Sequence, residues 1–130
     1  MKIFFPKEAI VEKRISITPD FLKKYIDNGL QVSIEKSMGE HLGFLDDNFK
    51  ELGAEIVERK KGFLEADIIC SVNKLNEEDL TEIKENSLIV SFLDPFNDQE
   101  LVENLRVKKI SSISMELIPR TTRAQKMDAL

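Results

Sequence analysis

The residues best suited to chemistry lie near the end of the sequence, in residues 115–130, which read MELIPRTTRAQKMDAL. Four of them carry guanidinium, amide or carboxylate groups: Arg120, Arg123, Gln125 and Asp128. Pro119 interrupts regular structure ahead of them, because proline lacks an N–H and disfavours helix in the preceding residue. A helix capped by a threonine here would place Gln125 and Asp128 on one face, and its N-terminus can dock a polar, phosphate-bearing ligand. Spacing alone favours a simpler alternative, a solvated cap before a surface helix.

The rest of the chain lacks the common catalytic and nucleotide-binding motifs. Its five glycines are too scattered for G-x-G-x-x-G or a phosphate-binding loop, so the chain by itself offers no backbone cradle for a pyrophosphate. The single cysteine, Cys70, lies in an apolar run, which predicts a buried free thiol. His41 has no cysteine or second histidine near it in sequence, so no metal site is expected. Acidic clusters at 46–47 and 77–79 fall at predicted helix starts, where the helix dipole accounts for them without catalysis.

Length and composition indicate one soluble globular domain. A chain of 130 residues, 42% hydrophobic and 33% charged, can bury a substantial core. No apolar run approaches the roughly 20 residues of a membrane span, and the N-terminal apolar stretch is too short for a signal peptide. The net charge of -5 argues against nucleic acid as a partner. The one tight basic run, 59–61, is interpreted as a solvated turn.

Hydrophobic periodicity predicts strands alternating with helices. Strands are expected at 2–5, 30–35, 54–57, 66–72, 88–93 and 109–114, and helices at 18–29, 46–52, 77–84 and 97–105. Thr18 is expected to cap the first helix and Pro19 to be its first residue, with an apolar stripe turned inward: Phe21, Leu22, Tyr25 and Ile26. This alternation predicts an open, mostly parallel α/β sheet with helices on both faces, flavodoxin-like or Rossmann-like.

In such sheets ligands bind beyond the carboxyl ends of the strands, where the strand order reverses. The loops to search are therefore 6–14, 72–75, 94–97 and 116–128. Arg14 and the Lys7–Glu8 pair lie in the first of these loops, where they form either a structural salt bridge or part of a site.

Several segments carry a resemblance to a known family. PRTTRAQKMDAL closely resembles PRISRAQSMDALSS of the proton-translocating NAD(P) transhydrogenase alpha subunit. The opening stretch KEAIVEKRISITPDFLKKYIDNGLQVSIEK resembles the start of the alanine dehydrogenase and transhydrogenase N-terminal domain. MGEHLGFLDDNFKELGAEIV, ADIICSVNK and SLIVSFLDPFNDQELVENL match later segments in order. The resemblance covers all 130 residues and is strongest to the transhydrogenase branch.

Two positions separate the branches of this family. Alanine dehydrogenases carry a substrate-binding lysine in a VKEP segment, where this chain has Asn73 followed by Lys74. They also carry a catalytic histidine where this chain has Asp94 or Pro95. Oxidative deamination needs a group that handles protons, whereas hydride exchange between two nicotinamides needs none. It needs two rings held face to face with water excluded, which suits a site of arginine, glutamine and aspartate.

The resemblance implies that Arg120, Gln125 and Asp128 are both the catalytic and the cofactor-binding residues, with no metal. Gln125 would hydrogen-bond the nicotinamide carboxamide or position the ring edge, and Arg120 would contact the nucleotide or a partner domain. Asp128 would hold Arg120 in place. The chain departs from the motif at Thr121–Thr122 and at Lys126, where Ile-Ser and Ser are usual.

The implied enzyme is an NAD(P) transhydrogenase that passes hydride from NADH to NADP and couples it to proton translocation. Residues 1–130 would be its N-terminal subdomain, and an NAD-binding Rossmann subdomain is expected after residue 130. Further implied partners are a membrane domain and an NADP-binding beta subunit, in a homo-oligomer peripheral to the cytoplasmic or matrix-like membrane face. The 130 residues alone are expected to be soluble and inactive. The alternatives are an alanine dehydrogenase-like oxidoreductase and a non-catalytic α/β interaction module.

Overall fold

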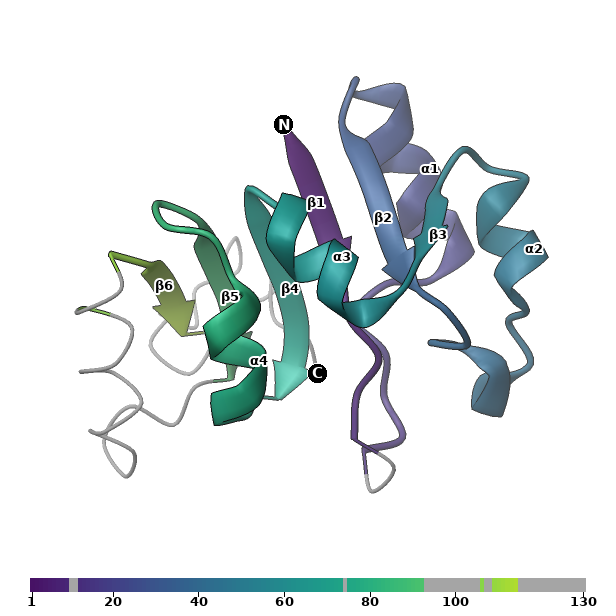
Figure 1. The fold of residues 1–130 in the computed structure, drawn as a ribbon. Coiled ribbons are helices and arrows are strands. Elements are labelled where there is room, and N and C mark those ends of the chain that lie inside the picture. The colour runs from purple at the N-terminus through teal and green to yellow at the C-terminus, as the bar shows by residue number, and fades with distance from the viewer. Residues whose placement is uncertain (10–11, 74, 93–105, 107–108, 115–130) are drawn as a thin grey trace, which may run out of the picture.

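The structure is a computed structural model that describes residues 1–9, 12–73, 75–92, 106 and 109–114 (Figure 1). Its strands are β1 (Lys2–Phe5), β2 (Gln31–Glu35), β3 (Glu55–Val57), β4 (Ile68–Asn73), β5 (Leu88–Phe92) and β6 (Ser111–Ser114). Its helices are α1 (Pro19–Asp27), α2 (Asp46–Lys50), α3 (Arg59–Glu65) and α4 (Glu77–Glu82), with a 3-10 turn η1 (Glu40–Leu42). The six predicted strands are therefore confirmed, with ends shifted by one or two residues. The helix predicted at 97–105 lies outside the described residues.

The six strands form one sheet in the order β3-β2-β1-β4-β5-β6, and every pair is parallel. This is the Rossmann order rather than the flavodoxin order, so the structure selects the Rossmann-like alternative of the two predicted. The order reverses between β1 and β4. The loops that follow these two strands therefore leave the sheet in opposite directions and open a crevice at its carboxyl edge.

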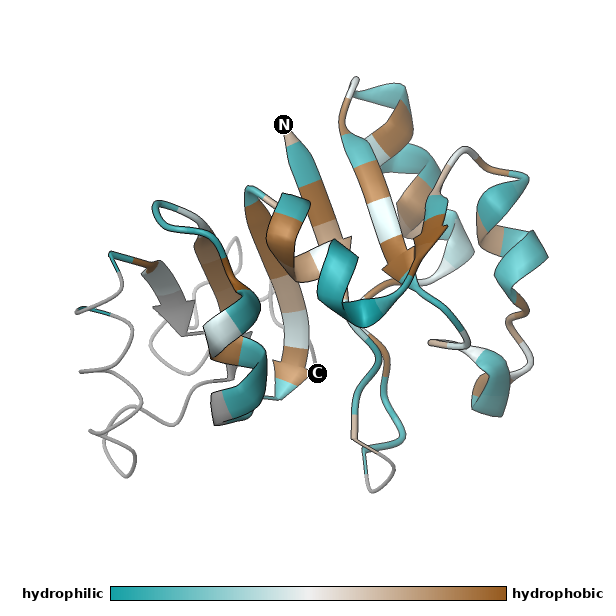
Figure 2. Cartoon of the chain, in the orientation of Figure 1, coloured by the Kyte–Doolittle hydropathy of each residue, from teal (hydrophilic) through white to brown (hydrophobic). Residues whose placement is uncertain are grey.

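Apolar residues cover both faces of the sheet. Residues of β1 alternate, so that Phe4 packs on one face while Ile3 and Phe5 pack on the other. The Phe4 side is covered by α3 and α4, and the opposite side by α1 and α2. Figure 2 shows the hydrophobic stretches concentrated along the central strands, with hydrophilic residues on the outer surfaces of the helices. Helices on both faces were predicted and are confirmed.

Helix α3 was not predicted, because the basic run at 59–61 was interpreted as a solvated turn. These residues instead begin a helix that packs on β1 and β2. Gly62 permits the close approach, since a Cβ added there would overlap the ring of Phe4. The prediction for α1 was partly wrong. Leu22 is buried and Ile26 packs against the core, but Phe21 is exposed beside Lys24 and Tyr25 is 37% exposed.

The remaining sequence predictions concern single elements. Asn76 caps α4 as predicted, because its Oδ1 accepts a hydrogen bond of 2.8 Å from the N–H of Asp79. Cys70 is a half-buried free thiol. Among the helices that the structure describes, none is long and apolar enough to cross a bilayer.

Candidate functional site

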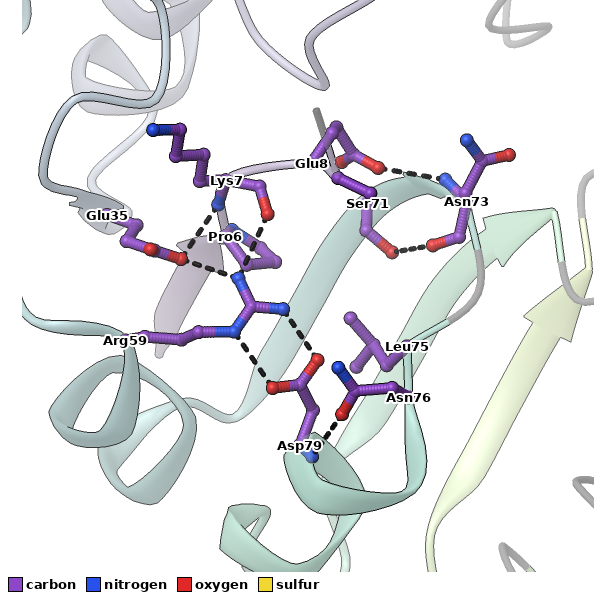
Figure 3. A pocket seen from close by; sticks show the side chains of 11 residues that line it. Pro6, Lys7, Glu8, Glu35, Arg59, Ser71, Asn73, Leu75, Asn76 and Asp79 are labelled. Atoms are coloured by element: carbon purple, nitrogen blue, oxygen red, sulfur yellow. Dashed lines mark hydrogen bonds and ion pairs between the residues drawn. The ribbon is translucent and has the colours of Figure 1, made fainter. Parts of the chain in front are cut away.

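The crevice where the strand order reverses contains a cavity of about 380 Å³ (Figure 3). Its walls come from the loop after β1, the ends of β2 and β4, the first residue of α3 and the start of α4. The lining residues are Pro6, Lys7, Glu8, Ala9, Glu35, Arg59, Ser71, Asn73, Leu75, Asn76 and Asp79. Two of the four loops predicted to hold the site, 6–14 and 72–75, therefore meet at this cavity.

Arg59 is the charged centre of the cavity wall. Its Nε donates to Oδ1 of Asp79 at 2.8 Å, and its Nη2 donates to Oδ2 of the same carboxylate. Its Nη1 donates to Oε1 of Glu35 at 2.7 Å and to the carbonyl oxygen of Lys7 at 2.9 Å. The hydrogen bonds to Asp79 are the largest cause that raises the pKa of Arg59, followed by the contacts with Glu35. The guanidinium is therefore firmly charged and held on three sides.

Local sequence explains how these partners meet. Arg59 is the first residue of α3 and follows β3 after one intervening residue, so it lies at the carboxyl edge. Asp79 lies in the first turn of α4, and its carboxylate is nearly buried, with 9% of the side chain exposed. The helix dipole was the predicted reason for this acidic residue, but its ion pair with Arg59 gives it a second role. The ring of Phe63, one turn along α3, lies 5.1 Å from the guanidinium carbon.

Glu8 ties the loop after β1 to the end of β4. Its two carboxylate oxygens accept hydrogen bonds from the backbone N–H groups of Val72 (2.9 Å) and Asn73 (3.1 Å). Burial raises the pKa of Glu8, and the two backbone hydrogen bonds oppose that effect. Glu8 thus accepts from two backbone donors next to the point where the register between β4 and β5 is irregular.

Arg14 forms a salt bridge, which was one of the two predicted alternatives for this residue. Its Nε and Nη2 donate to the two oxygens of Glu12, both at 3.0 Å. The side chain of Asn73 also donates to Glu12. These bonds, led by those from Arg14, lower the pKa of Glu12 to about 2. The return limb of the loop is therefore fixed to β4 through Asn73.

A second cavity of about 240 Å³ lies against the same loop. It is lined by Lys7, Glu8, Ala9, Glu12, Lys13, Ser37, Glu40 and His41. His41 donates from Nε2 to the carbonyl oxygen of Lys13 at 2.9 Å, so it supports the loop. Among the described residues, no group of three or more histidine, cysteine or acidic side chains could hold a metal ion.

The larger cavity can orient a polar ligand through hydrogen bonds. Its lining residues contain carboxylates, a guanidinium and two amides, but neither histidine nor cysteine in this described part of the chain. The acidic groups of Glu8, Glu35 and Asp79 all accept hydrogen bonds within the protein. Such a wall can hold a polar ring in one orientation through hydrogen bonds.

The predicted site residues Arg120, Gln125 and Asp128 lie outside the described residues, as do Arg123, Lys74 and Asp94. Sequence analysis missed five members of the cavity wall: Glu35, Arg59, Ser71, Asn76 and Asp79. A signal existed for two of them, because Glu35 ends a predicted strand and Arg59 follows another by two residues. The rule that ligands bind at strand ends applies to these positions as well as to the loops that were chosen.

Comparison with known proteins gives the same family for nearly the whole chain. Residues 4–130 match the family model described as alanine dehydrogenase/PNT, N-terminal domain. The NAD(P) transhydrogenase subunit alpha of Haemophilus influenzae is 34% identical over all of this chain and 25% of the relative. A transhydrogenase alpha-subunit protein of Rickettsia prowazekii is also 34% identical, over all of this chain and 36% of the relative. Alanine dehydrogenase 1 of Staphylococcus aureus is 32% identical over 88% of this chain and 30% of the relative.

Solved structures share the fold. A transhydrogenase from Sinorhizobium meliloti superposes with a TM-score of 0.92 and 25% identity, over 98% of this chain and 39% of the other. An L-alanine dehydrogenase gives a TM-score of 0.87 at 24% identity, over 95% of this chain and 34% of the other, which shows a common fold. The chain therefore spans a quarter to two-fifths of the length of the relatives it matches. It belongs to the alanine dehydrogenase/PNT N-terminal domain family.

Proposed function

We propose that this chain forms the first part of the NAD(H)-binding component of a proton-translocating NAD(P) transhydrogenase, in which hydride passes from NADH to NADP. The observation that carries this proposal is the match of transhydrogenase alpha subunits to the whole chain, including its closing segment. The alanine dehydrogenase match covers 88% of the chain. The sequence supports the same choice, because Asp94 or Pro95 stands where alanine dehydrogenases carry a catalytic histidine, and hydride exchange between nicotinamides requires geometry rather than proton transfer.

The described residues fit one end of a dinucleotide. The cavity of about 380 Å³ is concave, lies at the strand ends and offers amide groups from Asn73 and Asn76. The chain contains no glycine-rich cradle, so a pyrophosphate would be held elsewhere in the enzyme. When bound, the nicotinamide cofactor supplies the hydride chemistry. This chain's part is to orient the ring and to exclude water.

Specific roles follow for the closing segment. Gln125 hydrogen-bonds the carboxamide of the ring, Arg120 contacts the nucleotide or the adjoining domain, and Asp128 orients Arg120. NADP is held by a partner beta subunit, and a membrane domain couples the exchange to proton movement. The assembly is a homo-oligomer with this domain peripheral to the cytoplasmic or matrix-like face of the membrane.

The test uses the full protein that contains this chain, assembled with its partner subunits in membranes. NADH-dependent reduction of an NADP analogue is expected, with no NADH formation from alanine and NAD. Gln125→Ala should lower kcat by about 10-fold or more, because a positioning contact is lost. Lys126→Ser, which restores the residue usual in the similar motif, is the matched control and should retain activity.

Alanine dehydrogenase-like chemistry is the second candidate, and the match to alanine dehydrogenase 1 favours it. Alanine-dependent formation of NADH by the same preparation would establish that activity and refute hydride exchange as the main function. Failure to bind any nicotinamide nucleotide would leave a non-catalytic interaction module.

A further inference from the structure

A single guanidinium holds together four segments at the carboxyl edge of the sheet. Arg59 begins α3 and bonds to Asp79 of α4, to Glu35 at the end of β2 and to the Lys7 carbonyl in the loop after β1 (Figure 3). These partners are far apart in sequence, so their meeting is a product of the fold. A lysine in the same place could not make the planar, forked set of bonds that an arginine makes.

The backbone of Lys7 is held at both its N–H and its carbonyl oxygen. Its carbonyl oxygen accepts from Arg59 at 2.9 Å, and its N–H donates at 2.9 Å to the same Glu35 oxygen that Arg59 binds. Arg59, Glu35 and Lys7 therefore form a closed triangle of hydrogen bonds. Rotation of either peptide unit that flanks Lys7 would break one side of this triangle.

The next residue, Glu8, links the loop after β1 to the opposite side of the crevice. Glu8 follows Lys7 directly and binds the N–H groups of Val72 and Asn73 at the end of β4. The backbone bonds of Lys7 to Glu35 and Arg59, together with the bonds of Glu8 to the end of β4, thus fix the start of the loop after β1. Because this loop and the loop after β4 diverge at the crevice, the triangle sets the spacing between them.

The surroundings of Arg59 keep it in one orientation. Its side chain is one-third exposed, its partners Asp79 and Glu35 are 9% and 15% exposed, and the ring of Phe63 lies beneath the guanidinium. A fork bonded to a nearly buried carboxylate has little freedom to swing into solvent. The hydrogen bonds of Arg59 are therefore part of the packed structure rather than contacts between exposed side chains.

We infer that Arg59 is a positioning residue for hydride transfer: it fixes the loop after β1 and so sets the geometry of the crevice that receives the nicotinamide end of the cofactor. This inference rests on the proposed function. Arg59 acts through Lys7, Glu8 and Glu35 rather than by touching the reacting atoms. Misplacement of such a loop lowers the rate more than the affinity, because most dinucleotide contacts lie elsewhere.

The test compares wild type, Arg59→Lys, Glu35→Gln and Lys61→Gln in the full membrane-assembled protein. Arg59→Lys should lower kcat by about 10-fold while the KM for NADH stays within about 2-fold. Amide hydrogen exchange at Lys7 should quicken by about 10-fold, because the Glu35 carboxylate that accepts from this N–H loses its hydrogen bond from Arg59 and is held less firmly. Glu35→Gln, which keeps an acceptor for Lys7 but loses its charge, should give a smaller change in the same direction and serves if Arg59→Lys does not fold.

Lys61→Gln is the matched control, since Lys61 lies on the same helix and pairs with Glu55 on the surface away from the cavity. It should match wild type in kcat, KM and Lys7 exchange. Unchanged kcat in a folded Arg59→Lys protein would overturn the inference, as would a raised KM at constant kcat. Loss of kcat without faster Lys7 exchange would also overturn it, because Arg59 would then act directly. Absence of hydride transfer in wild type would refute the proposed function, and the inference with it.

Discussion

Two glutamates four residues apart, Glu8 and Glu12, hold the same loop but have opposite electrostatic environments. Burial raises the pKa of Glu8, whereas hydrogen bonds from Arg14 lower the pKa of Glu12 to about 2. Glu8 accepts hydrogen bonds from backbone N–H groups in a partly buried location, and Glu12 accepts them from a half-exposed guanidinium. The sign of each shift therefore follows from the surroundings of the carboxylate, and of the two residues only Glu12 adds stability to the fold when it ionises as pH rises from acid to neutral.

Replacement of Glu12 by glutamine tests this sign. The folded-state pKa is depressed below the usual value of 4.5, so ionised Glu12 stabilises the fold above that value and the contribution is lost as pH falls towards 2. Glu12→Gln should be less stable than wild type by about 1 kcal/mol at pH 7, a modest value because Arg14 is half exposed. Urea unfolding at several pH values should show the gap shrinking by more than half at about pH 3. Glu85→Gln, at an exposed turn position, is the control, and a gap that stays constant with pH would contradict the assignment.

Cys70 gives a second prediction at this scale. Burial raises the pKa of its thiol to about 11, from 9.0 for an unperturbed group. Since the thiolate is the reactive form, its fraction at pH 8 falls by about 100-fold in the folded chain. Reaction with an aromatic disulfide reagent, followed by absorbance, should therefore be slower by at least that factor in native than in denatured protein. Comparable rates in both states would show that the thiol is accessible and normally acidic.

Helices and strands could be predicted where a short stretch of sequence specifies them. The strands β1, β4 and β5 are short apolar runs bounded by polar residues, and the Asn76 cap lies directly before its helix. Helix α3 was missed because its first three residues are basic and Gly62 disfavours helix in isolation. The helix packs closely on Phe4 of β1, a contact between residues distant in sequence that local patterns do not show. Phe21 was assigned inward from spacing, but the sheet covers only the Leu22 side of α1.

Gly62→Ala tests the packing of α3 on β1. An added methyl group would overlap the ring of Phe4, which is fully buried and packs edge-on against Phe63. Overpacking should destabilise the chain by about 1–3 kcal/mol, more than alanine gains over glycine in helix propensity. The measurement is the urea midpoint relative to wild type. Lys60→Ala, at an exposed position of the same helix, should change it little. A variant as stable as wild type would mean that α3 can move away from the sheet at no cost.

The whole molecule shows why the site was harder to predict than the fold. Alternating strand and helix signals were enough for a parallel α/β sheet, and a general rule placed ligands at the carboxyl edge. The residues that meet there are Lys7, Glu35, Arg59 and Asp79, and no short motif links them. Their proximity depends on the strand order, which local patterns do not specify. Arg59 and Asp79 each also had a sufficient local explanation, as a solvated turn and a helix-dipole partner.

The last prediction concerns the 130-residue chain tested by itself. Its cavity fits one end of a dinucleotide, and its sequence has no glycine cradle for the pyrophosphate. Contacts to a nicotinamide end alone should not offset the cost of ordering a flexible dinucleotide, so NADH fluorescence should show no saturation up to about 1 mM.

The same chain should show no transfer of hydride from NADH to an NADP analogue over the uncatalysed rate, although its circular dichroism should be that of a folded α/β protein. The full protein measured in parallel is the positive control for both assays. Saturable NADH binding by the 130 residues would place the pyrophosphate site within this chain. Turnover would go further, since it would show that one wall of the crevice is sufficient to align two nicotinamide rings.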